Sequence, residues 1–197
     1  MKNVMTGGLI GCMVLLSMAL PANANLILNS DMESNTDGVV DNWTLSIWDP
    51  TNYPCTGEYA TDASYSPTHS LKLSASVSGN GKWSQWVNVT GGETYTLSGY
   101  IKRTNSSGAI LYKIYDANDN LLVNTGIADS YGAHDWMLLS TSIVIPDNGV
   151  KIEIALTLYH GTGTIWADNI TFVPEPATMM LLGLGSVSVL ISRRRRI

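Results

Sequence analysis

The sequence predicts an all-β fold, a sandwich of two antiparallel sheets, and three observations support this prediction. Apolar and polar residues alternate with a period of two in several segments, as they do in half-buried strands. Clusters of Gly, Asn, Ser and Asp separate these segments and have the composition of tight turns. No segment in residues 25–173 has the periodicity of an amphipathic helix. Seven or more short strands, each with one apolar face, favour a sandwich or jelly roll.

The expected strands follow from the alternation. Residues 150–159 show it most clearly, with five apolar residues on one face: Val150, Ile152, Ile154, Leu156 and Leu158. The other expected strands are 70–77, 83–89, 95–103, 109–115, 136–145 and 164–172, with turns at 78–81, 90–92, 105–108 and 146–149. Asp116–Asn120 has acidic spacing typical of a calcium loop, but Leu121 and Ile127 occupy the positions that require Gly and Glu, so this segment is predicted to be a hairpin turn.

The charge of the predicted domain excludes two classes of partner. Residues 25–173 contain six basic and fifteen acidic residues, a net charge of −9. Nucleic-acid binding requires clustered Lys and Arg, so no nucleic-acid partner is expected. Binding of the domain itself to an anionic membrane surface is disfavoured for the same reason.

Cysteine is scarce. Cys12 lies in the N-terminal leader and Cys55 is alone in the predicted domain. These counts exclude an intramolecular disulfide after processing and a cysteine-based zinc site. No redox or intermolecular role of Cys55 has further support in the sequence.

Residues 1–24 have the composition of a secretory signal peptide, whose apolar part is expected to be helical. Lys2 supplies the positive start, residues 9–20 are apolar, and Ala22-Asn23-Ala24 is a small-x-small cleavage site. The segment 9–12 resembles a lipoprotein cleavage box, but the apolar run continues past Cys12, so we interpret Cys12 as an ordinary leader residue. The predicted mature chain begins at Asn25.

The C-terminal segment predicts a short transmembrane helix. An apolar stretch, 178–191, is followed by four arginines, 193–196, which is the order of a stop-transfer signal. The stretch is shorter than the ~20 residues of a comfortable span. This length is compatible with a segment that is removed and with a permanent anchor in the inner membrane.

Pro174, Glu175 and Pro176 precede that stretch, and the order of Pro-Glu-Pro, apolar span and Arg tail resembles the PEP-CTERM sorting signal. The resemblance implies export by the general secretion machinery of a Gram-negative host, and processing by an exosortase near residues 174–176. It also implies a link to exopolysaccharide and biofilm. A plain C-terminal anchor is the alternative, and both place the domain outside the cytoplasm. The expected division is a signal peptide (1–24), a β domain (25–173) and a sorting signal (174–197).

The β domain resembles carbohydrate-binding modules of families 4 and 9. The matching segments occur in order along the chain: 25–33, Trp43, 70–73, 85–102, Asp135-Trp136 and 163–172, the last of which resembles the "gtvwfDdvsl" close of the family. The resemblance implies a galactose-binding-like jelly roll. Two departures concern the family's metal site, since Ser30-Asp31-Met32-Glu33 replaces Gly-Asp-Phe-Glu and Asn169 replaces the second Asp near the end.

The same resemblance implies one structural Ca²⁺ where the first strand meets the last. Calcium takes six to eight oxygen ligands, from carboxylates and carbonyls. Glu33 and Asp168 match the side-chain ligands, while Asp31 and Lys72 would contribute backbone carbonyls. The alternative is that Asp31 and Glu33 are surface acids.

Sugar binding is predicted from the Trp and Tyr residues, whose faces stack on the apolar faces of saccharides while amides take the hydroxyls. Trp48 and Tyr53 lie in an irregular stretch, 34–68, whereas Trp86 and Tyr159 point away from the apolar faces of their strands. Gln85 is the candidate to supply an amide to the sugar, and the alternative is that it lies in the core. Structural packing is the alternative role for the four aromatics. Four further aromatics are interpreted as core anchors: Trp43, Tyr95, Trp136 and Trp166.

Catalysis has little support in the sequence. His69, His134 and His160 are isolated, and the motifs of metalloproteases, serine hydrolases and phosphate-binding loops are missing. The predicted function is therefore an exported, non-catalytic carbohydrate-binding protein of the cell surface or polysaccharide matrix. A structural matrix or adhesion protein that does not bind sugar is the alternative. A small hydrolase would need two carboxylates roughly 5–10 Å apart in a cleft.

Overall fold

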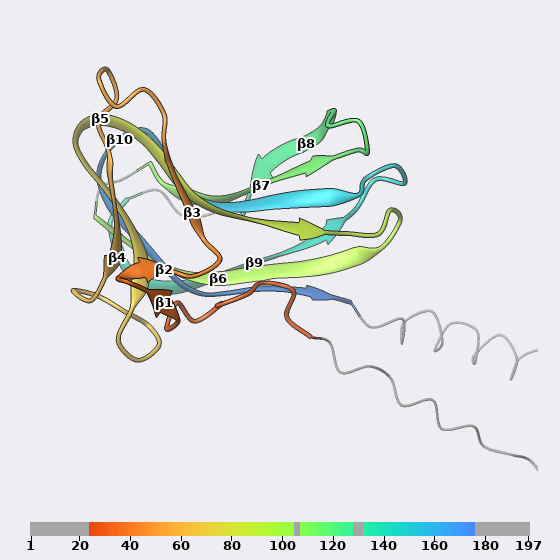
Figure 1. Cartoon of the computed structure of the whole chain (residues 1–197), viewed down its shortest axis with the longest axis horizontal. Coiled ribbons are helices and arrows are strands. Elements are labelled where there is room, and N and C mark those ends of the chain that lie inside the picture. Colours follow the sequence, from red (N-terminus) through yellow and green to blue (C-terminus); the bar gives the residue numbers. More distant parts are fainter. Residues whose placement is uncertain (1–23, 105–106, 128–131, 176–197) are drawn as a thin grey trace, which may run out of the picture.

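This computed structural model describes residues 24–104, 107–127 and 132–175. These residues contain ten strands (Figure 1). They are β1 (Asn35–Thr36), β2 (Val39–Val40), β3 (Thr44–Ile47), β4 (Thr56–Ala60), β5 (Ser70–Asn88), β6 (Thr94–Thr104), β7 (Ala109–Tyr115), β8 (Leu121–Gly126), β9 (His134–Val144) and β10 (Lys151–Pro174). No helix occurs within these residues, so the predicted all-β class is confirmed.

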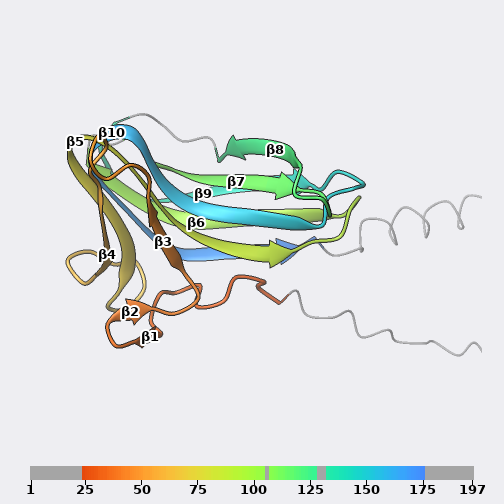
Figure 2. The ribbon, with the colours of Figure 1, turned by 45° about the horizontal axis from the view of Figure 1, so that its top comes forward.

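Two long strands, β5 and β10, run through both sheets of the sandwich and hold them together (Figure 2). The first half of β5 and the second half of β10 belong to one sheet, in the order β4–β5–β10–β6–β9, here called the β9 sheet. The second half of β5 and the first half of β10 belong to the other, β3–β5–β10–β7–β8, here called the β7 sheet. Every pair is antiparallel, which confirms the predicted jelly roll of two antiparallel sheets.

The predicted turn at 78–81 and the predicted break between 159 and 164 are wrong. At both places the chain bends and continues as one strand, and glycine permits the bend. Residues 78–81 continue β5 from one sheet into the other, and Gly79 pairs with Gly161 where β10 makes the same passage. A Cβ atom on Gly79 would lie 2.4 Å from the Ala75 Cβ and 2.7 Å from the Pro54 carbonyl oxygen. Glycine in a strand typically marks such a bend or close approach. The segments 150–159 and 164–172 are consequently one strand, β10, with register shifts between them.

The hairpin turn predicted at Asp116–Asn120 joins β7 to β8. The Asp116 carboxylate accepts hydrogen bonds from the backbone N–H groups of Asn118 and Asn120, both at 2.9 Å. β8 itself was not predicted. The stretch 34–68, interpreted as irregular, contains β1 to β4, which are short and carry exposed polar residues that weaken the alternation.

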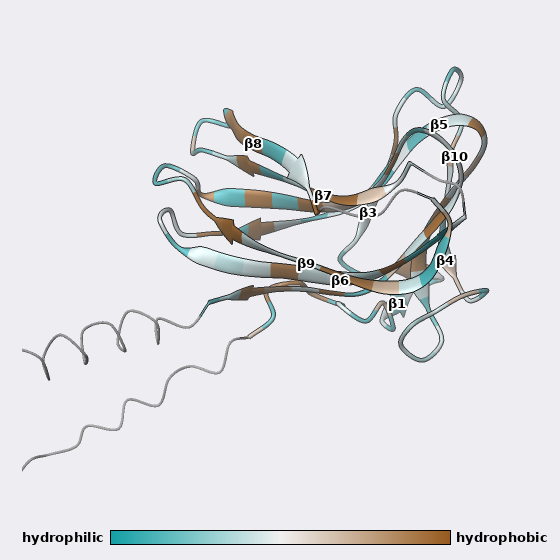
Figure 3. Cartoon of the chain, turned by 180° about the vertical axis from the view of Figure 1, so that it is seen from behind, coloured by the Kyte–Doolittle hydropathy of each residue, from teal (hydrophilic) through white to brown (hydrophobic). Residues whose placement is uncertain are grey.

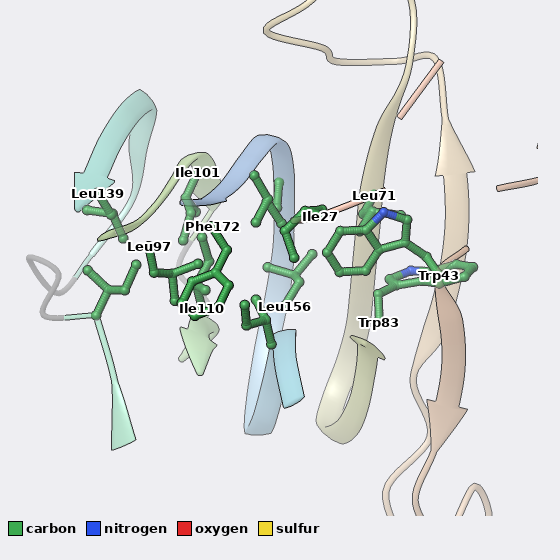
Figure 4. Packing of buried hydrophobic residues seen from close by; sticks show 14 of the residues in the cluster. Ile27, Trp43, Leu71, Trp83, Leu97, Ile101, Ile110, Leu139, Leu156 and Phe172 are labelled. Atoms are coloured by element: carbon green, nitrogen blue, oxygen red, sulfur yellow. The ribbon is translucent and has the colours of Figure 1, made fainter. Parts of the chain in front are cut away.

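The core lies between the two sheets. Hydrophobic residues, brown in Figure 3, are distributed along the strands of both sheets. The alternation predicted for 150–159 places Ile152, Ile154, Leu156 and Leu158 in the core, fully buried. Figure 4 shows Trp43 and Trp83 beside Leu71, and Phe172 beside Leu97. Burying a large apolar side chain contributes about 1.5–3 kcal/mol, so this layer dominates the stability of the fold.

Three of the four predicted aromatic anchors are buried: Trp43, Tyr95 and Trp166. The fourth, Trp136, is not a core residue. It is half-buried on the outer face of the β9 sheet, with its ring 6.2 Å from that of Tyr65. Its even-numbered position on β9 turns it outward, since Leu139 and Ile143 fill the inward positions.

The first and last described segments lie side by side. The Leu26 N–H donates to the Phe172 carbonyl at 2.9 Å, and the Asn25 carboxamide accepts from the Phe172 N–H at 2.8 Å. The predicted signal helix and C-terminal transmembrane helix lie outside the described residues. Within the described ranges, no helix is long and apolar enough to cross a membrane.

Cys55 is half-buried beneath the bend of β5, and burial raises the pKa of its thiol. The thiolate is the reactive form, so we expect Cys55 to react several-fold more slowly with a thiol reagent at pH 8 than an ordinary cysteine. Stopped-flow labelling with a chromogenic disulfide measures this rate, and the Cys12→Ser variant ensures that Cys55 is the reporter. The same chain unfolded in guanidinium is the control, and equal rates in the two states would contradict the expectation.

Candidate functional site

A cleft of about 730 Å³ lies along the outer face of the β7 sheet. Strand alternation selects its lining, because even residues of β5 and odd residues of β10 and β7 face outward. Asn80 is opposite Tyr159, Lys82 opposite Thr157, and Ser84 opposite Ala155. The small Ala155 lies in the lining between Glu153 and Thr157.

Two exposed aromatic residues form one end of the cleft. The side chains of Trp48 and Tyr159 are 71% and 57% exposed. The Trp48 N–H donates to the Asn80 carbonyl at 3.1 Å, and this bond continues the pairing of β3 with β5. Asn80 pairs with Tyr159 in turn, so the three residues form one row across the sheet. The row places two exposed aromatic residues beside Asn80, a combination that is typical of sugar-binding surfaces.

Charged residues form the floor of the cleft. Glu153 is only 4% exposed, although it faces outward, and the Lys82 ammonium donates to its carboxylate. Lys113 lies directly opposite Glu153 on β7, and Asn124 of β8 lies opposite Lys113. The lining therefore combines one carboxylate with two ammonium groups.

The face continues beyond the cleft to a second aromatic end. Trp86 pairs with Glu153 across the strands and is 51% exposed. Its ring lies 5.3 Å from that of Tyr115, and the Lys151 ammonium lies 5.3 Å from the Trp86 ring centroid. The six-residue step from Asn80 to Trp86 spans about 20 Å along β5. The outer face of the β7 sheet is thus long enough for several units of an extended glycan.

The structure brings three of the five predicted sugar-binding residues to this face: Trp48, Trp86 and Tyr159. Tyr53 is half-buried and is not part of the lining of the cleft, and its ring stands edge-on to that of His160 at 4.5 Å. Gln85 faces the core, because its odd position on β5 turns it inward. Its carboxamide accepts from the Leu28 N–H at 2.8 Å and donates to the Leu28 and Asn42 carbonyls, so Gln85 is a structural residue and not a ligand for the cleft.

Sequence reasoning missed Lys82, Lys113 and Glu153. The alternation contained a signal for two of them. Lys82 and Trp86 are both even positions of one strand, and Glu153 and Tyr159 are both odd positions of another, so each pair shares the outer face of its strand. The order of strands in the sheet was the missing information. Only the adjacency of β5, β10 and β7 brings these three charges together.

The predicted calcium position contains a network of protein hydrogen bonds. Asp168 is fully buried, and its carboxylate accepts from the N–H groups of Tyr65, Ser66 and Asn169 at 2.8, 2.7 and 2.6 Å. The Ser66 hydroxyl lies 2.8 Å from Asp168 Oδ1 and 3.1 Å from the Asp31 carbonyl oxygen. Ser66 therefore links the first described segment to the last strand, as the predicted ion would.

The other two predicted ligands are engaged elsewhere. Burial raises the pKa of Glu33, but hydrogen bonds from His69 and Thr68 outweigh it and hold that pKa below its usual value. The Lys72 carbonyl, which is the predicted ligand atom, accepts from the Trp83 indole N–H at 3.0 Å. The Lys72 ammonium lies 2.8 Å from Asp62 and 3.1 Å from Glu58. The hydrogen bond with Asp62 raises the pKa of Lys72 and lowers that of Asp62.

These groups, as arranged, do not fit a calcium ion. Both oxygens of Asp168 are occupied by protein donors, which an ion would have to displace. In the described ranges, no three His, Cys, Asp or Glu side chains converge as metal ligands. Calcium at Asp31, Glu33, Lys72 and Asp168 stays a prediction, which unfolding with and without calcium tests.

The end of the chain matches a known motif. Residues 172–196 match the model of the PEP-CTERM protein-sorting motif. The chain carries a PEP-CTERM sorting signal. The signal begins inside the sandwich, since Pro174 ends β10 and Glu175 remains attached to it. The Glu175 N–H donates to the Thr94 carbonyl at 2.9 Å, and its carboxylate accepts from the hydroxyls of Ser142 and Thr96 at 2.8 and 3.2 Å. Pro176 and the rest of the motif lie outside the described residues.

Solved structures share the fold of the domain. A family 4 carbohydrate-binding module is 22% identical, with a TM-score of 0.54 over 76% of this chain and 99% of that one. The CBM22-1 xylan-binding domain of Paenibacillus barcinonensis Xyn10C is 17% identical, with a TM-score of 0.54 over 78% and 96%. The TM-scores show a common jelly-roll fold. No curated protein matches the sequence.

A third structure is the enzymatically active domain of bacteriophage CBA120 tailspike protein 4. It is 17% identical, with a TM-score of 0.59 over 77% of this chain. The match covers only 21% of the tailspike chain, so the likeness concerns one part of that protein. Two of these three similar structures are carbohydrate-binding modules.

Proposed function

We propose that this protein is an exported, non-catalytic carbohydrate-binding protein of the cell surface or extracellular polysaccharide matrix. Its sorting signal supports export and exosortase processing at the Pro174–Pro176 motif. Its jelly roll supports sugar binding, because carbohydrate-binding modules share this fold. The proposed site is the cleft on the β7 sheet, and a polysaccharide is the proposed partner.

The observation that carries the proposal is the pair of exposed aromatics at the mouth of the cleft. Trp48 and Tyr159 are 71% and 57% exposed, so most of the surface of these two neighbouring aromatic residues is in contact with water. Stacking a sugar on them would remove that surface from water. The neighbouring Asn80, Lys82 and Asn124 would take the hydroxyls of the sugar, so the cleft has the mixture of apolar and polar groups that small-molecule sites share.

The lining also supports a non-catalytic role. Glu153 is the one carboxylate among the described residues that line the cleft, and it is paired with Lys82. A glycosidase of the usual kind needs two carboxyl groups, one acting as acid and the other as base or nucleophile. This lining offers one carboxyl group, that of Glu153, which forms an ion pair with the Lys82 ammonium.

We expect the Trp48→Ala variant to bind a glycan ligand about five- to thirtyfold more weakly than the unchanged protein, because removing one stacking face costs on the order of 1–2 kcal/mol. A glycan array identifies the ligand and titration calorimetry measures its Kd. Trp136→Ala, on the other sheet, is the matched control and should bind normally. Folded protein that binds neither the array nor the host's own exopolysaccharide would contradict the proposal.

One observation favours the second candidate, a structural or adhesion protein. The outer face of the β9 sheet carries an aromatic cluster in which the rings of Tyr65 and Tyr100 stack at 3.4 Å. Trp136 lies at the edge of Tyr65, and Leu138, paired with Tyr100, is exposed. An apolar surface of this kind is suited to protein contacts. Loss of partner binding on Trp136→Ala, with glycan binding absent, would favour this candidate.

A further inference from the structure

We infer that the cleft on the β7 sheet recognises an acidic polysaccharide, through a salt bridge between Lys113 and a carboxylate of the glycan. The inference rests on the proposed function and names the class of its ligand.

The basic residues are concentrated on the face that carries the cleft. The domain has a net charge of −9, and only six basic residues occur in 25–173. Three of the six, Lys82, Lys113 and Lys151, have the outward parity of the β7 sheet. The cleft lining contains Lys82 and Lys113 against the single carboxylate of Glu153. The cleft is thus a positive site on a negative domain.

Lys113 differs from the other lysines of the described residues in having no carboxylate partner. Lys72 pairs with Glu58 and Asp62, Lys82 with Glu153, Lys102 with Asp135, and Lys151 with Asp119. Glu153 is opposite Lys113 across the strands, but Lys82 occupies its carboxylate. Lys113 is therefore the uncompensated charge of the cleft.

The surroundings of Lys113 suit an anion delivered by a ligand. The side chain is half-buried, so its charge is less screened than that of a free surface lysine. Asn124, directly opposite on β8, can add an amide donor to the same anionic group. A sugar unit stacked on Trp48 or Tyr159 would place later units of the chain over Lys82 and Lys113. A uronic acid supplies both the stacking face and the carboxylate.

The acidic net charge of the domain does not oppose this contact strongly. The Debye length at physiological salt is about 8 Å, so charges elsewhere on the domain are largely screened from a ligand in the cleft. The nearest charges then decide the interaction, and these are two ammonium groups and one paired carboxylate. Selectivity for acidic glycans would thus arise at short range.

Matched pairs of polysaccharides test the inference. Polygalacturonate, alginate and hyaluronate are each compared with their methyl-esterified forms, which keep the sugar and remove the charge. Binding is measured by titration calorimetry on the full chain at physiological salt, in a detergent without sugar head groups. We expect at least one acidic form to bind about tenfold more tightly than its ester, as one partly buried ion pair allows. In Lys113→Met this ratio should fall to within about twofold.

Lys102→Met is the matched control, because it removes a lysine from the outer face of the opposite sheet, and it should keep the tenfold ratio. Circular dichroism verifies the fold of each variant. If the esters bind as tightly as the acids, the inference is overturned and the proposed function stands. If neither form of any pair binds, and the array is also negative, both fail.

Discussion

Asp168→Ala is expected to lower the free energy of unfolding by about 3–5 kcal/mol. The change would remove a fully buried carboxylate and leave the N–H groups of Tyr65, Ser66 and Asn169 without their acceptor. A buried donor that loses its partner costs about 1–3 kcal/mol, and partial relaxation of the loop around Ser66 reduces the sum. Urea unfolding followed by tryptophan fluorescence measures the change. Asp135→Ala, an exposed carboxylate, is the control and should change stability little.

The same measurement decides whether calcium binds here. An ion bound only to the folded state stabilises it by RT ln(1 + [L]/Kd), so a site at Asp168 would make the midpoint of unfolding rise with calcium. The hydrogen bonds described here stabilise this position without an ion, and we therefore expect equal midpoints in EDTA and in millimolar calcium. A midpoint that rises with calcium, and no longer does so in Asp168→Ala, would establish the ion. A loss below 1 kcal/mol in EDTA would contradict the structural role of Asp168.

Lys82→Met is expected to destabilise the fold by about 2–3 kcal/mol, and more than Glu153→Gln does. Removing Lys82 leaves the carboxylate of Glu153 buried without its partner, and breaking a buried pair in this way typically costs 3–5 kcal/mol. The Lys82 side chain is 32% exposed, so solvent screening reduces that figure. Removing Glu153 leaves an ammonium group that water can still reach.

A double-mutant cycle with Lys82→Met and Glu153→Gln measures the coupling of the pair. The double variant should be more stable than Lys82→Met alone, because it no longer contains an unpaired buried charge. Equal destabilisation by the two single changes would contradict the asymmetry. Lys102→Met, whose partner Asp135 is exposed, is a suitable comparison and should cost much less.

The fold was predictable because alternation is a local property. It identified the inward face of β10, the outward direction of Trp86 and Tyr159, and the turn at Asp116 from nearest neighbours alone. The passage of β5 between sheets was not predictable in the same way. Glycine at position 79 is compatible with a reversal and with a bend, and only its pairing with Gly161 decides between them.

The candidate site was predictable in part. Trp48 was predicted as a sugar contact in an irregular stretch, and Tyr159 as pointing away from the apolar face of its strand. Gln85 was left between the core and the cleft, because the end of β5 had no known neighbour. The Leu28 and Asn42 backbone that Gln85 binds lies more than forty positions away in the sequence. The charged floor was missed for a related reason. A lysine on β7 and a glutamate on β10 become one site only when the order of strands is known.

The continuity of β10 has a mechanical consequence. Its first half contributes Glu153, Thr157 and Tyr159 to the cleft, and its second half ends at Pro174, where the sorting signal begins. Tension between a held glycan and the C-terminal end would therefore run along a single central strand, bonded to neighbours on both sides in each sheet. Inter-strand hydrogen bonds stand perpendicular to an antiparallel strand, so such a load shears many of them at once and does not open them one by one. The domain is thus suited to resist pulling along the axis that joins the proposed glycan-binding face to the sorting signal.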